Sequence, residues 1–92
     1  MNDAPEKPQL AVALEYERGT HNAPVVVAKG RGPIAEQIMA VARDNDIAIE
    51  ANPMLAEALS GVPLDESIPH ELYQAVAEVI GFVLRAGYRP KR

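Results

Sequence analysis

The segment from Glu71 to about Ala86 most constrains the fold, because it is the longest stretch with helical periodicity and is apolar on more than one face. Two neighbouring stripes run along it at helical spacing. The first stripe consists of Leu72, Val76, Val79 and Val83, and the second of Tyr73, Ala77, Ile80 and Leu84. One stripe suffices to cover a small sheet. The second therefore indicates either a docking surface or a further core contact beneath another helix.

The amino-terminal half predicts a β-hairpin followed by a helix. Leu10–Tyr16 alternates in part between large apolar and other residues, and the β-branched run Val25–Val27 follows a polar loop that contains Gly19. Gly30 to Pro33 breaks this pattern. Helical spacing then begins, with Pro33 suited to the first helical position and the apolar residues Ile34, Ile38, Val41 and Ala42 on one face.

Two further elements are expected before the last helix. Ile47–Ile49 is a short apolar stretch typical of a third strand, which the helical crossover would place parallel to the strand before it. Asn52 and Pro53 predict a capped helix that ends at Ser60 and Gly61. An asparagine before proline can also cleave its own backbone in a strained turn, but this pair fits a helix cap better.

These elements predict an α/β fold of the α+β kind, with a small mixed β-sheet of about three strands packed with three main helices. A chain of 92 residues has room for one such domain. We assign a flexible lead-in to residues 1–9, the domain to residues 10–86 and a basic tail to residues 87–92. A core this small is marginally stable, which favours association with a partner.

Composition excludes several classes of function. The chain has no cysteine, which excludes disulfides and thiolate catalysis and is consistent with a reducing cytoplasm. No apolar run is long enough for a membrane span or a signal peptide. Residues 1–84 carry 13 acidic and 5 basic side chains, so nucleic-acid binding is not expected from an acidic body with few aromatic residues. The basic tail is expected to increase solubility or to steer the chain weakly towards a membrane.

No catalytic or metal site is expected. None of the possible nucleophiles and bases lies in a recognisable catalytic motif. The candidates are Thr20, His21, Ser60, Ser67 and His70. Both histidines are expected to be solvated, and two histidines without cysteine make a poor zinc site. We therefore expect no enzymatic activity and no cofactor.

The loop from Lys29 to Gly32 offers an alternative function. Lys29, Gly30, Arg31 and Gly32 lie between a strand and a helix, where helix N–H groups attract anions. The spacing matches neither the P-loop nor the dinucleotide fingerprint, and Pro33 removes one donor. A small phosphate- or nucleotide-binding module remains the alternative to a protein-binding domain.

Several segments together resemble the cytoplasmic domain of the FlhB/YscU family. They are Ala11–Tyr16, Ala23–Pro24, Val27–Gly30 with Gly32, Ile34–Ala35 with Ile38, Asn52–Pro53 with Leu55–Ala56 and Ala58–Leu59, and above all Ile68–Val79. The last segment is similar to the family's Ile-Pro-x-x-Leu-Tyr-x-Ala-Val-Ala-Glu-Val run. The resemblance covers residues 10 to about 84, with a small length difference near residues 61–67.

This resemblance implies a role in protein export. Members of the family sit at the inner-membrane gate of flagellar and injectisome type III secretion systems and switch export from early to late substrates. The resemblance places a shallow apolar docking patch for export substrates on Ala23, Pro24, Ala77 and Ile80. It also implies a cytoplasmic location, with the cytoplasmic face of the inner membrane as a candidate site.

The family's self-cleavage motif, Asn-Pro-Thr-His, has no counterpart here. The corresponding stretch reads Glu6, Lys7, Pro8, Gln9, so self-cleavage is not expected. The strand that precedes the motif in the family, and the membrane-spanning half, are not expected either. The chain thus resembles the carboxyl-terminal cleavage product as a separate polypeptide.

A missing strand would leave backbone groups unpaired on its neighbour, which another chain can cover by strand addition. The expected partners are export substrates or export-apparatus proteins. For strand pairing, we expect a second copy of the chain or a truncated FlhB-type membrane half. A stabilising subunit without substrate contact is a third alternative. Which secretion system the chain serves does not follow from its sequence.

Overall fold

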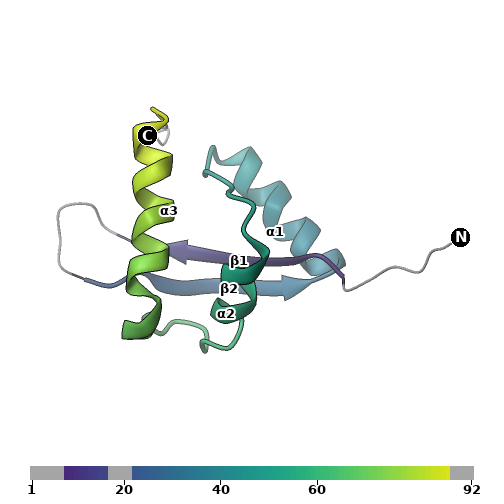
Figure 1. Cartoon of the computed structure of the whole chain (residues 1–92). Coiled ribbons are helices and arrows are strands. Elements are labelled where there is room, and N and C mark those ends of the chain that lie inside the picture. Colours follow the sequence, from purple (N-terminus) through teal and green to yellow (C-terminus); the bar gives the residue numbers. More distant parts are fainter. Residues whose placement is uncertain (1–7, 17–21, 88–92) are drawn as a thin grey trace, which may run out of the picture.

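The computed structural model describes residues 8–16 and 22–87. Two strands lead into three α-helices and one short 3-10 helix in this part of the chain (Figure 1). Their bounds are β1 Leu10–Glu15, β2 Val25–Arg31, α1 Pro33–Asp44, α2 Pro53–Leu59, η1 His70–Leu72 and α3 Tyr73–Arg85. The lead-in assigned to residues 1–9 and the tail assigned to residues 87–92 lie mostly outside the described residues, so both stay predictions.

The two strands form the predicted antiparallel hairpin. Leu10 lies opposite Arg31 and Glu15 opposite Val25, and β2 continues beyond the expected valine run as far as Arg31. The register shifts between Ala13 and Leu14, which leaves Val27 as an extra residue in a β-bulge.

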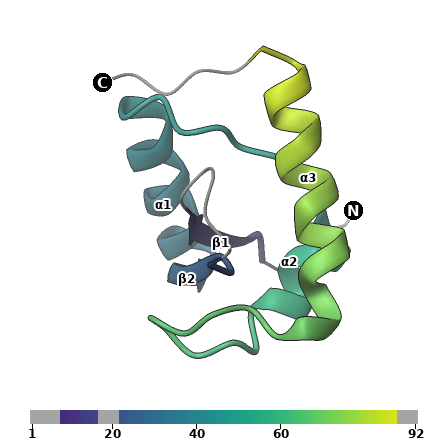
Figure 2. The same ribbon diagram turned by 90° about the vertical axis from the view of Figure 1, so that its left-hand side faces the viewer.

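Helices cover both faces of the hairpin and make three layers. Figure 2 shows α1 on one side of the strands and α2 and α3 on the other. Small residues line the contact between the sheet and α1: Ala11 of β1 and Ala35 of α1 are buried. A β-carbon on Gly30 of β2 would overlap the side chain of Ile34 in α1. Small side chains at this contact let α1 lie close to the sheet.

Gly30→Ala should therefore destabilise the protein. The added methyl group has no room against Ile34, so α1 must shift or Ile34 must leave its rotamer. Overpacking of this kind costs about 1–3 kcal/mol of unfolding free energy. Urea unfolding measures the change, with Gly61→Ala as control, since a β-carbon there meets its nearest atom only at 3.9 Å. Equal stability of Gly30→Ala and wild type would contradict the packing argument.

The core lies on the other face of the sheet. It consists of Val26, Leu59, Val62, Ile68 and Val76, contributed by β2, the end of α2, the following loop and α3. Val26 and Val76 are 0% and 1% exposed and are the largest side chains to be fully enclosed in the described part of the chain. A core this small is expected to make the domain only marginally stable.

The predicted third strand is wrong. Residues 47–51 have no strand conformation, and the sheet within the described residues is two-stranded and antiparallel, not mixed. The N–H of Ile47 donates to the carbonyl of Ala42 at 2.8 Å, so this residue extends the end of α1 and does not pair with a strand. Ile47 and Ile49 are 55% and 45% exposed. The α+β class with three main helices is confirmed.

The helix boundaries largely follow the sequence signals. α1 begins at Pro33, and the Asn52 Oδ1 accepts a hydrogen bond from the N–H of Leu55 at 3.1 Å as the cap of α2. The last helix begins two residues later than predicted because His70–Leu72 form a 3-10 turn. None of the described helices combines the length and apolarity needed to cross a bilayer.

Candidate docking site

The first part of the candidate site is the entry to β2. Ala23 and Pro24 precede this strand, and the carbonyl of Pro24 accepts a hydrogen bond from the N–H of Ile68 at 2.9 Å. A β-bridge between Val25 and Ser67 continues this pairing. Proline suits the position because it offers no N–H to a ladder. The pairing holds Ala23 and Pro24 beside the segment that leads into α3.

The second part is one face of α3. Val76 points into the core, and Ile80, one turn further on, is half-buried against that core. Ala77 follows Val76 in the chain and is exposed. The second apolar stripe of this helix is therefore not fully buried. Tyr73, at its beginning, is 44% exposed.

These two parts enclose a hollow of about 220 Å³, which we call the apolar hollow. It is lined by Asn22, Ala23, Pro24, Ile68, Tyr73, Val76, Ala77 and Ile80. All four residues assigned to the docking patch from the sequence line it. The volume is below the roughly 300–1,000 Å³ of small-molecule sites and fits apolar side chains of a peptide better.

Sequence reasoning missed the other four lining residues. Tyr73 already belonged to the second apolar stripe, so its periodicity could have placed it there. Ile68 and Val76 line the hollow from the core side, where they are 3% and 1% exposed. Their contribution depends on how the hairpin meets α3, which a pattern along one segment does not encode.

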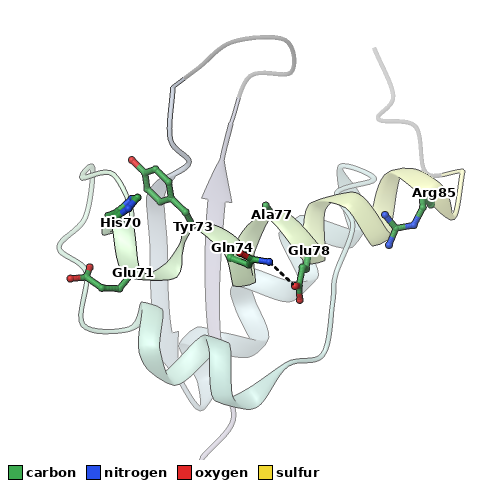
Figure 3. A pocket seen from close by; sticks show the side chains of 7 residues that line it. All are labelled: His70, Glu71, Tyr73, Gln74, Ala77, Glu78 and Arg85. Atoms are coloured by element: carbon green, nitrogen blue, oxygen red, sulfur yellow. Dashed lines mark hydrogen bonds between the residues drawn. The ribbon is translucent and has the colours of Figure 1, made fainter.

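A second depression of about 560 Å³, the polar trough, lies along the outer face of η1 and α3. Figure 3 shows its lining side chains, which are His70, Glu71, Tyr73, Gln74, Ala77, Glu78 and Arg85. Tyr73 and Ala77 line both depressions. The ring of His70 meets that of Tyr73 edge-on at 5.0 Å, and Gln74 Nε2 donates to Glu78 Oε2 at 3.4 Å.

The outer edge of β1 is open within the part of the chain that the structure describes. The N–H of Gly32 donates to the carbonyl of Gln9 at 2.8 Å, so these two residues form a hydrogen-bonded pair. Along an antiparallel ladder, hydrogen-bonded pairs alternate with non-hydrogen-bonded pairs. This alternation turns the N–H and C=O groups of Leu10, Val12 and Leu14 away from β2. These three residues have no backbone partner on that side among the described residues.

The opposite edge, on β2, is occupied near its start. The N–H of Val26 donates to Glu66 at 3.0 Å, and the carbonyl of Val26 accepts from the N–H of Asp65 at 2.7 Å. Further along, Lys29 Nζ donates to the carbonyls of Ser60 and Val62 at 3.0 and 2.6 Å. The loop that follows α2 therefore covers this edge from Pro24 to Val26.

The cations of the alternative phosphate site are engaged elsewhere. Lys29 binds carbonyl oxygens after α2, and the guanidinium of Arg31 forms two hydrogen bonds of 3.1 Å with Glu57. The hydrogen bond with Glu57 raises the pKa of Arg31, so this group stays protonated. Both cations would have to break these contacts to reach a phosphate. No observation favours the phosphate-binding alternative.

The other catalytic candidates that the structure describes make contacts within their own segments. Thr20 and His21 lie outside the described residues. Ser60 Oγ donates to the carbonyl of Glu57 at 2.7 Å, and the ring of His70 contacts Tyr73. No group of three or more potential metal ligands occurs in residues 8–16 and 22–87.

Comparison with known proteins gives a consistent family match. The sequence model described as "FlhB HrpN YscU SpaS Family" matches residues 8–83. The flagellar biosynthetic protein FlhB of Aquifex aeolicus is 42% identical over 76 residues, or 82% of this chain and 22% of that protein. The uncharacterized protein YlqH of Bacillus subtilis is 35% identical over 75 residues, or 82% of this chain and 81% of that protein. The chain thus spans about a fifth of the FlhB relatives but most of YlqH.

Solved structures of the same family also match most of this chain. The PscU C-terminal domain superposes with a TM-score of 0.75 at 31% identity, covering 80% of this chain and 95% of that one. The cytoplasmic domain of FlhB from Shewanella putrefaciens superposes with a TM-score of 0.75 at 42% identity, covering 82% and 61%. The family match over residues 8–83 includes β2 and most of α3, which line the apolar hollow.

Proposed function

Because this chain belongs to the FlhB HrpN YscU SpaS family, we propose that it is a protein-binding adapter of a flagellar or related type III export apparatus. It acts at the cytoplasmic face of the export gate, by holding other polypeptides and not by catalysis. One observation carries this proposal: residues from two distant parts of the sequence, Ala23 with Pro24 and Ala77 with Ile80, line one apolar hollow.

The shape of the apolar hollow supports transient binding. Its volume is only about 220 Å³, so a bound peptide buries little apolar area and gains little affinity. Weak, short-lived contacts of this kind are typical of small transient interfaces. An export checkpoint needs such contacts because each substrate must leave again.

A second partner pairs with β1. Its open edge offers three outward N–H groups and three carbonyls at Leu10, Val12 and Leu14, which is the template for strand addition. The partner is a second copy of this chain or a truncated membrane half of an FlhB-type protein. Cleavage at Glu6 to Gln9 does not occur under this proposal, because no asparagine is present there to cyclise.

Ala77→Asp tests the docking function. Ala77 is exposed, so a carboxylate there leaves the fold intact but places a charge in the apolar hollow. We expect at least a tenfold loss in capture of rod- and hook-type export proteins encoded in the same genome, because an unpaired charge must be desolvated on binding. Affinity pull-down followed by titration measures the loss, and Ala23→Asp should behave alike.

Ala75→Asp is the matched control. Ala75 is also exposed on α3 but does not line the apolar hollow, so this variant should capture the export proteins as wild type does. Undiminished capture by Ala77→Asp and Ala23→Asp would contradict the docking function and favour a stabilising subunit without substrate contact.

A further inference from the structure

The outer edge of β1 lies between helices that extend past it. In Figures 1 and 2, α1 rises beyond this edge on one face of the hairpin, and the carboxyl-terminal half of α3 does so on the other face. The segment that joins α1 to α2 crosses from one side to the other beyond the same edge. A strand added to β1 would therefore have a helix on each of its faces.

β1 itself shows what such a position requires of a strand. Ala11 is buried, and it alternates with Val12 and Leu14, which pack against the core on the opposite face. Every residue from Leu10 to Leu14 is apolar. Strands covered on both faces consist of continuous apolar runs, whereas strands covered on one face alternate between apolar and polar residues. A neighbouring strand between the same helices has to meet the same requirement.

The sheet-facing sides of α1 and α3 lose burial towards their carboxyl-terminal ends. Ala35 in α1 and Val76 in α3 are 0% and 1% exposed. Ala42 and Val83 lie about two turns further along on the same side of each helix, yet both are only half-buried. Because α1 and α3 lie on opposite faces of the sheet, these two sides face each other where the helices pass β1. An added strand would therefore meet apolar side chains from both helices.

We propose that β1 accepts an extended segment of a different polypeptide that is apolar on both faces, as a run of about five consecutive apolar residues. This inference rests on the strand pairing proposed above and specifies the chemistry of the strand. Its backbone pairs with the outward N–H and C=O groups of Leu10, Val12 and Leu14, and its side chains alternate between the side of α1 and the side of α3. A second copy of the chain would instead bring its own α1 and α3 against those of the first.

The test compares two sets of short synthetic peptides on the wild-type protein. In the first set, about five consecutive central residues are drawn from valine, isoleucine, leucine and phenylalanine, with serine and lysine at both ends for solubility. In the second set, serine or glutamate replaces the second and fourth of these residues, so that one face is polar. Fluorescence anisotropy measures affinity, and NMR hydrogen exchange of the Leu10, Val12 and Leu14 amides shows whether the peptide pairs with β1.

The first set should slow exchange of all three amides and should bind at least about tenfold more tightly than the second, whose polar side chains must be desolvated against a helix. A matched pair of protein variants tests the two helices. Ala42→Lys/Val83→Lys places charge beside the added strand and should weaken binding of the first set at least about tenfold. Ala40→Lys/Phe82→Lys adds the same charge to exposed positions of the same helices and should bind as wild type does.

Thermal unfolding checks that both variants fold, and the comparison of the two peptide sets on wild-type protein does not depend on them. Ala77→Asp, which changes the apolar hollow, should bind the first set as wild type does. The strand site and the docking site can therefore fail independently.

The outcomes separate this inference from the proposed function. Equal binding and equal amide protection by both sets would overturn the requirement for two apolar faces and leave strand pairing in place. If neither set protected the outward amides of β1, the inference and the strand pairing would both fall, whereas docking in the apolar hollow would still be judged by Ala77→Asp. Outward amides protected without peptide, in a dimer detected by light scattering, would identify a second copy as the occupant and overturn the inference. Binding of the first set that is unaffected by Ala42→Lys/Val83→Lys would place the peptide away from the helices and also overturn it.

Discussion

Val76→Asp is expected to leave the protein without a cooperative thermal transition at 25 °C and above. Val76 is 1% exposed and belongs to a core of five buried side chains. A carboxylate buried there has no cationic partner among the core residues, which costs several kcal/mol. Domains of this size hold only about 5–10 kcal/mol of stability, so the loss is comparable to the whole. Circular dichroism during heating measures it.

Ala75→Asp controls for the introduction of a carboxylate as such. Ala75 is the exposed neighbour of Val76 in the first turns of α3, where negative charge is tolerated by the helix dipole. Its unfolding free energy should stay within about 0.5 kcal/mol of wild type. A cooperative transition of Val76→Asp near the wild-type temperature would show that the core does not depend on this side chain.

Amide hydrogen exchange along β1 should alternate from residue to residue. The N–H groups of Ala11 and Ala13 point towards β2 and should be strongly protected, whereas those of Leu10, Val12 and Leu14 point outwards and should exchange at least about 100-fold faster. NMR on a dilute sample, shown to be monomeric by light scattering, measures each amide. Added strand partner should then protect the outward amides.

The alternation itself is the internal control, because both sets of amides belong to the same strand. Uniformly strong protection of β1 in the monomeric sample would mean that its outer edge is already covered. In that case β1 would have no unpaired backbone groups to which a further strand could be added. Uniformly weak protection would instead mean that the hairpin is not stable by itself, and would contradict the observed pairing.

Local signals in the sequence predicted much of the fold. Pro33 and the Asn52–Pro53 pair mark helix starts through their own backbone chemistry, and the structure has helices at both places. The hairpin was predicted from two apolar runs and a polar loop. The strand predicted at Ile47–Ile49 is wrong because the N–H of Ile47 bonds to the carbonyl of Ala42 and extends the end of α1 instead of pairing with a strand. No local pattern in the sequence reports this hydrogen bond.

The residues of the candidate docking site were predicted partly from helical periodicity and partly from a family resemblance. The apolar stripe along α3 predicted surplus surface, and the exposure of Ala77 agrees with it. The partnership of Ala23 and Pro24 with this helix followed from a family resemblance, not from periodicity. The extra residue Val27 in β2 could not be foreseen, because a bulge is a property of two paired strands and not of either one.

The unequal edges of the hairpin limit how far copies of this chain can assemble. The loop after α2 pairs with β2 over Pro24 to Val26, so a new strand can be added there only if this pairing breaks, whereas the outer edge of β1 has no backbone partner among the described residues. Two copies joined through β1 would cover the outer edges of both β1 strands. Because growth into open-ended fibres would also need the start of β2 to release this pairing, a closed pair of two copies is favoured over a longer assembly.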